Sequence, residues 1–249
     1  MTSTPSLRVV PDPDDIAAET RRVRGFLGMA EDEPTELTFF VEGRIWLAQV
    51  RTLSDHVRAL RHAETIRGFN GSYQLVNGPL VEEIFARYEP NKVHRAWNGR
   101  ANDKNIQQVR ALFLDCDPIR IKGISSTDAQ KQAAREVADA VCELLVTRVP
   151  AESIGRGDSG NGFFVLVALE PFAPTAETGK RIGALLALFQ RKFGTDSVKI
   201  DQSVFNPARL MPAAGTWKRK GWHTPERPHR KTSFSCTETT IRAPLEAIA

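Results

Sequence analysis

The sequence contains few cysteines, few tyrosines and no long apolar run. Its three cysteines, Cys116, Cys142 and Cys236, are far apart and never form a CxxC pair, which argues against a disulfide framework and against a cysteine-rich zinc site. No apolar stretch approaches the roughly 20 residues needed to cross a bilayer. The segment 1–15 lacks the basic and then apolar pattern of a signal peptide. We therefore expect a cytoplasmic protein with no membrane partner.

Charge is distributed unevenly along a chain whose net charge is only +4. Residues 1–40 contain four arginines and eight acidic residues, a balance of −4, whereas residues 201–235 contain seven Lys or Arg and two acidic residues, a balance of +5. The basic segment also contains Trp217 and Trp222. Such a segment is typical of proteins that bind a phosphate-rich partner, although a solvated basic loop has the same composition.

The first part of the chain predicts a mixed α/β unit over residues 14–108. Residues 1–13 carry no periodic pattern and are expected to form a flexible arm. The predicted elements that follow are a helix from Asp14 to Gly28, a hairpin over 36–50 that turns at Glu42 and Gly43, a helix over 54–66, a strand over 71–76 and a helix over 79–88.

The order of elements after residue 109 predicts a defined topology. The apolar run 109–116 is typical of a buried central strand. The predicted elements that follow are a helix over 127–148, strands over 153–156 and 163–170, a helix over 176–193 and a strand over 198–201. Thr127 and Gln130 have the spacing of a capping box at the start of the first of these helices. The order β-α-β-β-α-β is that of the split βαβ fold of RNA-recognition modules and polymerase palms. We therefore predict an α+β protein in which an RRM-like module, 109–235, packs on the N-terminal part and precedes a C-terminal tail, 236–249.

Two aspartates lie at the end of the predicted strand 109–116, in the sequence LFLDCDP. Alternate residues of a strand face the same way, so Asp115 and Asp117 should project from one face. Adjacent carboxylates repel each other unless a divalent cation lies between them; two solvated strand-end aspartates are the alternative. Asp201 ends the last predicted strand, which in a split βαβ sheet can lie close to the first. Three carboxylates without histidine would favour one or two Mg²⁺ or Mn²⁺ ions over zinc.

The segment GRGDSGNGFF contains glycines at positions 155, 157, 160 and 162, just before the predicted strand 163–170. Glycines allow a backbone to approach a ligand closely and to turn its N–H groups toward an anion. Ser159 and Asn161, which flank Gly160 and precede Gly162, add polar side chains. A strand rather than a helix follows, so the segment is neither a Walker A loop nor a dinucleotide-binding turn. A simple glycine-rich hairpin turn is the alternative.

Basic residues in the last part of the chain suit contacts with phosphate. Arg209 could contact triphosphate oxygens with both arms of its guanidinium group, and Lys218 and Lys220 could supply point charges. The residues predicted to contact a nucleic-acid backbone or base are Trp217, Arg227 and Arg230.

Taken in this order, the motifs resemble those of the archaeo-eukaryotic primase superfamily, and in particular the primase-polymerases of bacteria, phages and plasmids. The matching segments are LFLDCDP, GDSGNG before a strand, and KID followed by NPARLMPAAGTWKRKG and ERPHR, and the resemblance extends over roughly residues 70–232. It implies an RRM-like catalytic core and two-metal nucleotidyl transfer from dNTP or NTP substrates. It also implies a single-stranded DNA template and a primer as partners.

The resemblance assigns site residues by their place in the motifs. Asp115 and Asp117 match the first acidic motif and Asp201 matches the third, which implies that they are catalytic ligands of two Mg²⁺ or Mn²⁺ ions. The second motif, which faces the phosphates of the incoming nucleotide, corresponds to Ser159, Gly160, Asn161 and Gly162, and the basic positions after the third acid correspond to Arg209 and Lys220.

One position departs from the family pattern. Members of the family usually have a histidine two residues after the last glycine of the second motif, where it contacts nucleotide phosphate, and this chain has Phe164. The loss of one charge-assisted contact of this kind costs about 1.5–3 kcal/mol. We therefore expect nucleotide binding to be weakened at this position.

Two functions follow from these patterns and stay open at this point. The first is a primase-polymerase that retains metal-dependent activity. The second is a weakened or inactive module that binds single-stranded DNA in a replication complex. A nucleotide cyclase fits less well, because the basic ERPHRK segment suits a polymeric substrate. Because the chain ends soon after this segment, we expect either a separately encoded replicative helicase as partner or a longer parent protein.

Overall fold

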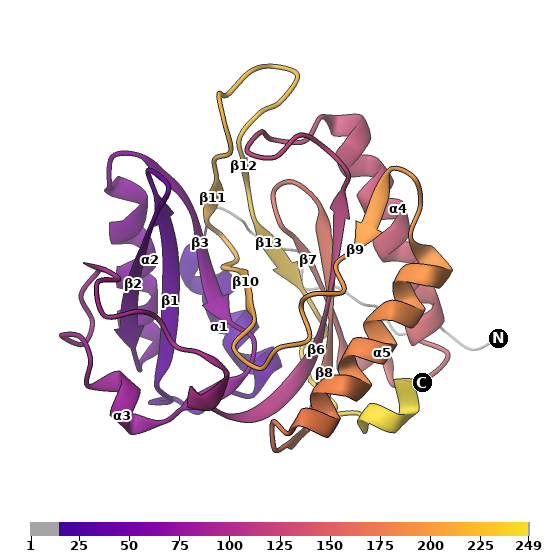
Figure 1. Ribbon diagram of the computed structural model, residues 1–249, viewed down its shortest axis with the longest axis horizontal. Coiled ribbons are helices and arrows are strands. Elements are labelled where there is room, and N and C mark those ends of the chain that lie inside the picture. The colour runs from indigo at the N-terminus through magenta and orange to yellow at the C-terminus, as the bar shows by residue number, and fades with distance from the viewer. Residues whose placement is uncertain (1–14, 249) are drawn as a thin grey trace.

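A computed structural model describes residues 15–248 as an α+β protein with two main antiparallel sheets side by side (Figure 1). The α+β class predicted from the sequence is confirmed. The predicted arm, residues 1–13, lies outside the described residues. No helix within residues 15–248 is both long enough and apolar enough to cross a membrane.

The first sheet is built mainly from the N-terminal part of the chain. Its strands, in spatial order, are β10 (Leu210–Pro212), β3 (Phe69–Leu75), β1 (Thr35–Val41), β2 (Arg44–Val50) and β5 (His94–Arg95). The predicted hairpin is confirmed: Glu42 and Gly43 both have positive φ angles, 49° and 73°, between β1 and β2. Turns of this kind match the twist of the strands that they join.

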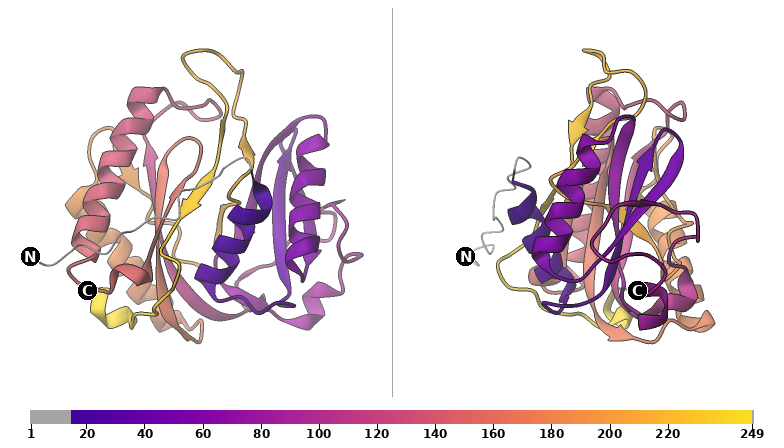
Figure 2. Two further views of the ribbon diagram at one scale, coloured as in Figure 1. Left: turned by 180° about the vertical axis from the view of Figure 1, so that it is seen from behind. Right: turned by 90° about the vertical axis from the view of Figure 1, so that its left-hand side faces the viewer.

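Helix α2 (Leu53–Thr65) packs on this first sheet, and α1 (Ile16–Leu27) lies against α2 and β13 (Ser233–Ser235) (Figure 2). Asp15 accepts hydrogen bonds from the first turn of α1, and Gly28 ends that helix in the left-handed conformation, as the sequence predicts. Leu60 of α2 is fully buried against the sheet with Leu37 and Phe39. These contacts form a separate core for the N-terminal part.

The second sheet contains the predicted β-α-β-β-α-β unit. Its strands, in spatial order, are β13 (Ser233–Ser235), β7 (Ile154–Asp158), β8 (Phe163–Phe172), β6 (Ile106–Pro118) and β4 (Gly78–Leu80), with β9 (Val198–Ile200) also paired to β6. Helices α4 (Asp128–Leu145) and α5 (Ala176–Phe193) pack on the strands of this unit. The predicted capping box of α4, between Thr127 and Gln130, is present.

Segments that are distant in the sequence join the two sheets. Strand β10 follows β9 in the chain but pairs with β3, so Leu210 lies opposite Leu75. Strand β4 pairs with β6, where Leu80 lies opposite Ile106. Because this pairing keeps residues 78–80 extended, α3 is limited to Glu82–Phe85 and is shorter than the helix predicted over 79–88. The surface between the sheets is therefore assembled from separate parts of the chain.

A short two-stranded ribbon follows β10. It consists of β11 (Trp217–Lys218) and β12 (Arg230–Lys231), with Lys218 opposite Arg230. The loop between these strands projects beyond the rest of the molecule at the top of Figure 1. The ribbon brings the basic segment of the sequence to the gap between the two sheets.

Candidate active site

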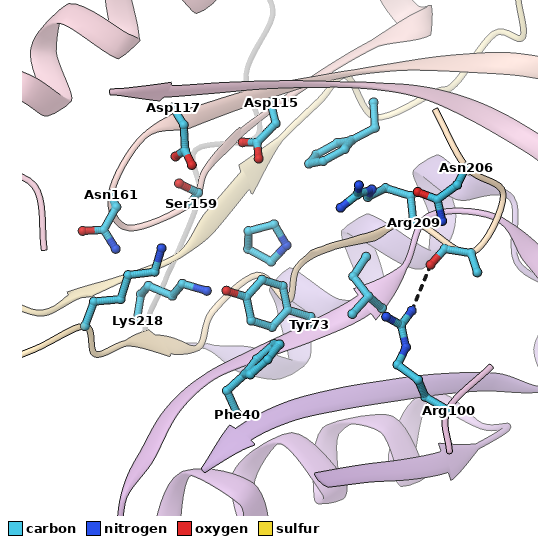
Figure 3. Close-up of a pocket in the computed structure, with 15 residues that line it drawn as sticks. Phe40, Tyr73, Arg100, Asp115, Asp117, Ser159, Asn161, Asn206, Arg209 and Lys218 are labelled. Atoms are coloured by element: carbon cyan, nitrogen blue, oxygen red, sulfur yellow. Dashed lines mark hydrogen bonds between the residues drawn. The ribbon is translucent and has the colours of Figure 1, made fainter. Parts of the chain in front are cut away.

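The paired aspartates lie on one face at the end of β6, with both carboxylates directed into a pocket between the sheets (Figure 3). The glycine-rich turn approaches them closely. A Cβ atom at Gly162 would lie 2.6 Å from the carbonyl oxygen of Cys116 and 3.0 Å from a carboxylate oxygen of Asp117. Glycine at position 162 is therefore required for the close approach of this turn to β6.

Asp201 lies directly after β9, and the structure places it beside the other two acids. Ile200 pairs with Cys116, and the backbone N–H of Asp201 donates a hydrogen bond of 2.9 Å to the carbonyl oxygen of Asp115. The predicted proximity of the first and last strands of the unit is thus confirmed. The Asp201 carboxylate accepts hydrogen bonds from the backbone N–H and the hydroxyl of Ser203, at 2.9 and 2.8 Å. Its side chain is therefore turned toward Ser203 rather than into the pocket.

The three acids interact electrostatically. Burial, followed by the negative charges of Asp117 and Asp201, raises the pKa of Asp115 well above its usual range, and Lys220 and Arg209 partly oppose this shift. A divalent cation between Asp115 and Asp117 would remove this repulsion, and carboxylate oxygens are the donors that Mg²⁺ and Mn²⁺ prefer. Over residues 15–248, no group of three His, Cys, Asp or Glu side chains is close enough to hold a metal ion. The aspartate pair fits such an ion, whereas Asp201 would have to turn away from Ser203 to join it.

The turn between β7 and β8 forms one side of the pocket and is held by its own hydrogen bonds. The Asp158 carboxylate accepts from the N–H of Gly160 at 2.7 Å, and the Ser159 hydroxyl accepts from the N–H of Gly162 at 2.9 Å. The Asn161 amide oxygen accepts from a backbone N–H of the segment before α4, whereas its buried NH₂ group has no partner in the described chain. Ser159 and Asn161 both line the pocket. The turn thus offers an unsatisfied donor to a ligand.

Lys218 is the most deeply buried cation of the pocket. Its side chain extends from β11, is only 5% exposed, and places Nζ 3.6 Å from the centre of the Tyr73 ring. Burial, and secondarily the charge of Lys220, lowers its pKa well below the ordinary value. Within residues 15–248 no acidic side chain forms an ion pair with it. An anionic group in the pocket would supply the missing counter-charge.

Lys220 and Arg209 lie nearer to the acids. Burial and the charge of Arg120 lower the pKa of Lys220, while Asp117 and Asp115 raise it. Arg209 donates a hydrogen bond of 2.9 Å to the carbonyl oxygen of Ser203, and its buried Nε has no partner in the part of the chain described. The structure therefore brings all three predicted phosphate-binding cations to one pocket.

Several lining residues were not identified from the sequence. They include Phe40 on β1, Tyr73 on β3, Arg100 in the loop before β6, and Asn206. Arg100 donates a hydrogen bond of 3.0 Å to the carbonyl oxygen of Ala208, and the Phe40 and Tyr73 rings meet edge to face (Figure 3). Asn206 could have been found from its place in the NPAR segment beside Arg209. Tyr73 and Phe40 carry no local signal, because they reach the pocket only through the pairing of β10 with β3.

The predicted nucleic-acid contacts are engaged within the chain. The half-buried Trp217 ring lies near two cations: its centre is 5.8 Å from the guanidinium carbon of Arg219 and 5.7 Å from Nζ of Lys231. Arg227 donates to the carbonyl oxygen of Ser125 at 2.8 Å. Arg230 forms an ion pair of 2.6 Å with Asp128 at the start of α4. Arg227 and Arg230 therefore hold the basic ribbon to the start of α4, whereas Trp217 packs against the core of the first sheet.

Phe164 lies opposite Asp115 in the pairing of β8 with β6. The ring is fully buried, with its centre 5.5 Å from that of Phe113 and 6.3 Å from that of Phe234. It covers Gly157 so closely that any Cβ atom at that position would collide with the ring. Phe113, not Phe164, lines the pocket. Position 164 therefore contributes to the core of the second sheet.

The pocket has a volume of about 400 Å³ and combines an acidic wall with a cationic one. Such a site can bind an anionic ligand and a divalent cation together. No protein-family model and no curated protein matches the chain significantly, so its chemistry is inferred from the geometry of this pocket.

Proposed function

We propose that the chain is a DNA primase-polymerase of the archaeo-eukaryotic primase type, which makes or extends primers on single-stranded DNA. The observation that carries the proposal is the opposition of Asp115 and Asp117 to Lys218 and Lys220 across one pocket. A nucleoside triphosphate, dNTP or NTP, needs cationic contacts for its phosphates and a divalent cation close to them. The pocket volume falls in the range typical of small-molecule sites.

The strand order of the second sheet supports a palm-like module. The unit runs β9-β6-β8-β7 in space, with β6 and β9 adjacent, and all these pairs are antiparallel. This is the order expected of an RRM-like split βαβ fold. Asp115 and Asp201 then lie at the ends of neighbouring strands, where an RRM-like palm would hold its metal ligands.

Asp115 and Asp117 are the proposed ligands of Mg²⁺ or Mn²⁺, with Asp201 as the third ligand for a pair of ions. Bound ions of this kind activate the attacking hydroxyl group and neutralise charge that develops on the phosphates. Lys218 and the Asn161 amide would position the phosphates, and Arg209 would hold them from the opposite end of the pocket. Because Lys218 is buried, its electrostatic attraction to a phosphate group would be stronger than at an exposed site.

Two observations favour the second candidate, a catalytically weakened or inactive module that binds single-stranded DNA in a replication complex. Phe164 is part of an aromatic stack where the family has a phosphate-binding histidine, and Asp201 is turned toward Ser203. This candidate predicts DNA binding that needs no divalent metal and that survives loss of Asp115. A separately encoded replicative helicase as partner stays a prediction for either function.

The test is nucleotide incorporation on single-stranded DNA, with and without an annealed primer, in Mg²⁺ or Mn²⁺. We expect metal-dependent product from the wild type and none from the Asp115→Ala/Asp117→Ala variant. The lane without primer decides whether the protein initiates chains or only extends them. No product from the wild type, together with tight template binding in the presence of a chelator, would reject the enzyme and leave the binding module.

A further inference from the structure

Two loops at the mouth of the pocket carry exposed apolar side chains. We name them the rim loops: residues 119–126, directly after β6, and residues 219–229, between β11 and β12. Trp222 is 90% exposed and Ile121 is 75% exposed, and Ile119 is exposed as well. The two loops adjoin each other, because Gly221 lies against Gly123 and Ile124, and large exposed apolar side chains on adjoining loops are typical of an interaction site.

Contacts between the rim loops hold them in place. The Ser125 hydroxyl donates to the carbonyl oxygen of Lys220 at 3.1 Å, and Arg227 donates to the carbonyl oxygen of Ser125 at 2.8 Å. Within the longer loop, the N–H of His229 donates to Nδ1 of His223 at 3.0 Å. Trp222 is therefore presented by a loop that is already ordered, which lowers the entropic cost of binding through its ring.

The charge of the rim loops indicates the chemistry of the partner. They contain five Lys or Arg residues and one acid, Glu226, so their balance is five minus one, or +4 with neutral histidines. Only Pro118 separates the shorter loop from Asp117, and Lys220 of the longer loop lines the pocket. A partner on the rim loops is therefore anionic and lies next to the proposed site of phosphoryl chemistry.

We propose that the rim loops bind single-stranded nucleic acid, with unpaired bases against Trp222 and Ile121 and with phosphates near Lys122. A flat exposed indole and an exposed aliphatic side chain on the adjoining loop match the faces of unpaired bases, and every base has such a face. A duplex stacks these faces inside and offers its phosphates and the edges of its bases instead. The use of the bound strand as a template rests on the proposed function, whereas the binding itself does not.

The test measures binding of a labelled single-stranded oligonucleotide by fluorescence anisotropy, with a chelator and without nucleotide. These conditions separate the inference from the proposed function, because a failure of catalysis leaves the binding result unchanged. We expect Trp222→Ala to weaken binding roughly tenfold to hundredfold. The matched control is Trp97→Ala, since Trp97 is also exposed, at 67%, but packs with Tyr88 and His94 beside the first sheet. This control should bind as the wild type does.

Two further readouts separate stacking from charge. Trp222→Phe should retain most of the affinity, and Lys122→Gln should reduce the salt dependence by about one phosphate contact. Neither side chain is buried, so the melting temperature should not change. Equal affinity of Trp222→Ala and wild type for the single strand, or equal affinity of the wild type for single strand and duplex, would overturn the proposal. Trp222-dependent binding to anionic lipid vesicles without binding to the oligonucleotide would assign the surface to a membrane instead.

Discussion

The two walls of the pocket differ in charge and in how the chain builds them. The acidic wall comes from β6 and from the turn before β8, both within one sheet. The facing wall combines β1, β3, β10 and β11 with the loop before β6. Strand geometry alone places the acids together, whereas the cations and aromatic rings come together only through long-range pairing. The positions of Asp115 and Asp117 therefore depend on a single strand, whereas the facing wall depends on how the two sheets are joined.

The largest effect is expected from the acidic wall, for the substitution Asp115→Asn. We expect incorporation to fall by on the order of a thousandfold or more, because the carboxylate is a proposed metal ligand. Thermal stability at pH 7 should rise, since burial and two neighbouring carboxylates raise the pKa of Asp115. A raised carboxyl pKa means that ionisation costs stability above the unfolded-state pKa, and asparagine removes that cost.

Primer extension and a thermal melt on the same preparation check this prediction. Glu170→Gln is the control, because Glu170 is an exposed acid on β8 outside the pocket. A variant that loses both activity and stability would show that Asp115 supports the fold rather than the chemistry.

The second-largest effect is expected on the facing wall, for the substitution Lys218→Met. We expect the KM for nucleotide to rise about tenfold to hundredfold, as for loss of one charge-assisted contact. Stability should not fall, because burial lowers the pKa of Lys218 and disfavours its charge in the empty pocket. The exposed residue Lys180 of α5 provides the control, Lys180→Met.

Lys218 also predicts a proton linkage, which is measured without divalent metal because metal binding at Asp115 would release protons. The pKa of Lys218 is low in the empty pocket, and a bound polyphosphate raises the pKa again, so nucleotide binding should take up a proton. Calorimetry in two buffers of different ionisation enthalpy would detect this uptake, and it should vanish in Lys218→Met. Unchanged proton uptake in the variant would assign the linkage to another group.

The difference between the walls explains which parts of the molecule could be predicted. The hairpin at Glu42, the capping box at Thr127 and the β-α-β-β-α-β order depend on local patterns, and each is confirmed. The closeness of Asp201 to Asp115 followed from that order. Tyr73 could not be predicted as a lining residue, because no local pattern reveals that β10 pairs with β3. The same reason explains the short helix α3, whose expected first turn pairs with β6 instead.

A smaller effect is expected at the back of the acidic wall, for Phe164→His. The ring of Phe164 lies in an apolar stack, and Phe113 lines the pocket in its place. An imidazole there would bury polar atoms without partners, so we expect stability to fall by about 2 kcal/mol. Incorporation measured below the melting temperature should not increase.

The control for this change is Phe164→Leu, which removes aromatic packing but adds no polar atom. A rise in kcat/KM for Phe164→His alone would mean that the imidazole does reach the nucleotide, and the acidic wall would then lack a phosphate donor at this position.

The effect that is smallest at neutral pH distinguishes the two parts of the molecule by their response to acid. His56 of α2 is fully buried, and neither ring nitrogen has a hydrogen-bond partner in the described residues. Burial, and secondarily the charge of Arg24, lowers its pKa to about 3. The unfolded chain therefore binds a proton between the ordinary pKa of 6.5 and about 3, where the folded chain does not. Above pH 6.5 His56 is neutral in both states, so its burial has no pH-dependent cost. Below pH 6.5 the free energy of unfolding decreases by about 1.4 kcal/mol per pH unit until the folded-state pKa of about 3 is reached.

Chemical denaturation at a series of pH values checks this slope, with His56→Leu as the variant and His62→Leu as its control. His62 lies on the same helix but is exposed, so its loss should leave the slope unchanged, whereas loss of His56 should flatten it. Asp115 has the opposite sign, because acid removes the repulsion that raises its pKa. Acidification should therefore lower the stability of the first sheet and its helix α2, whereas protonation of Asp115 should raise the stability of the second sheet. Amide hydrogen exchange at pH 5 would resolve this difference, with protection lost first in α2, and equal loss in both sheets would mean that they unfold as one unit.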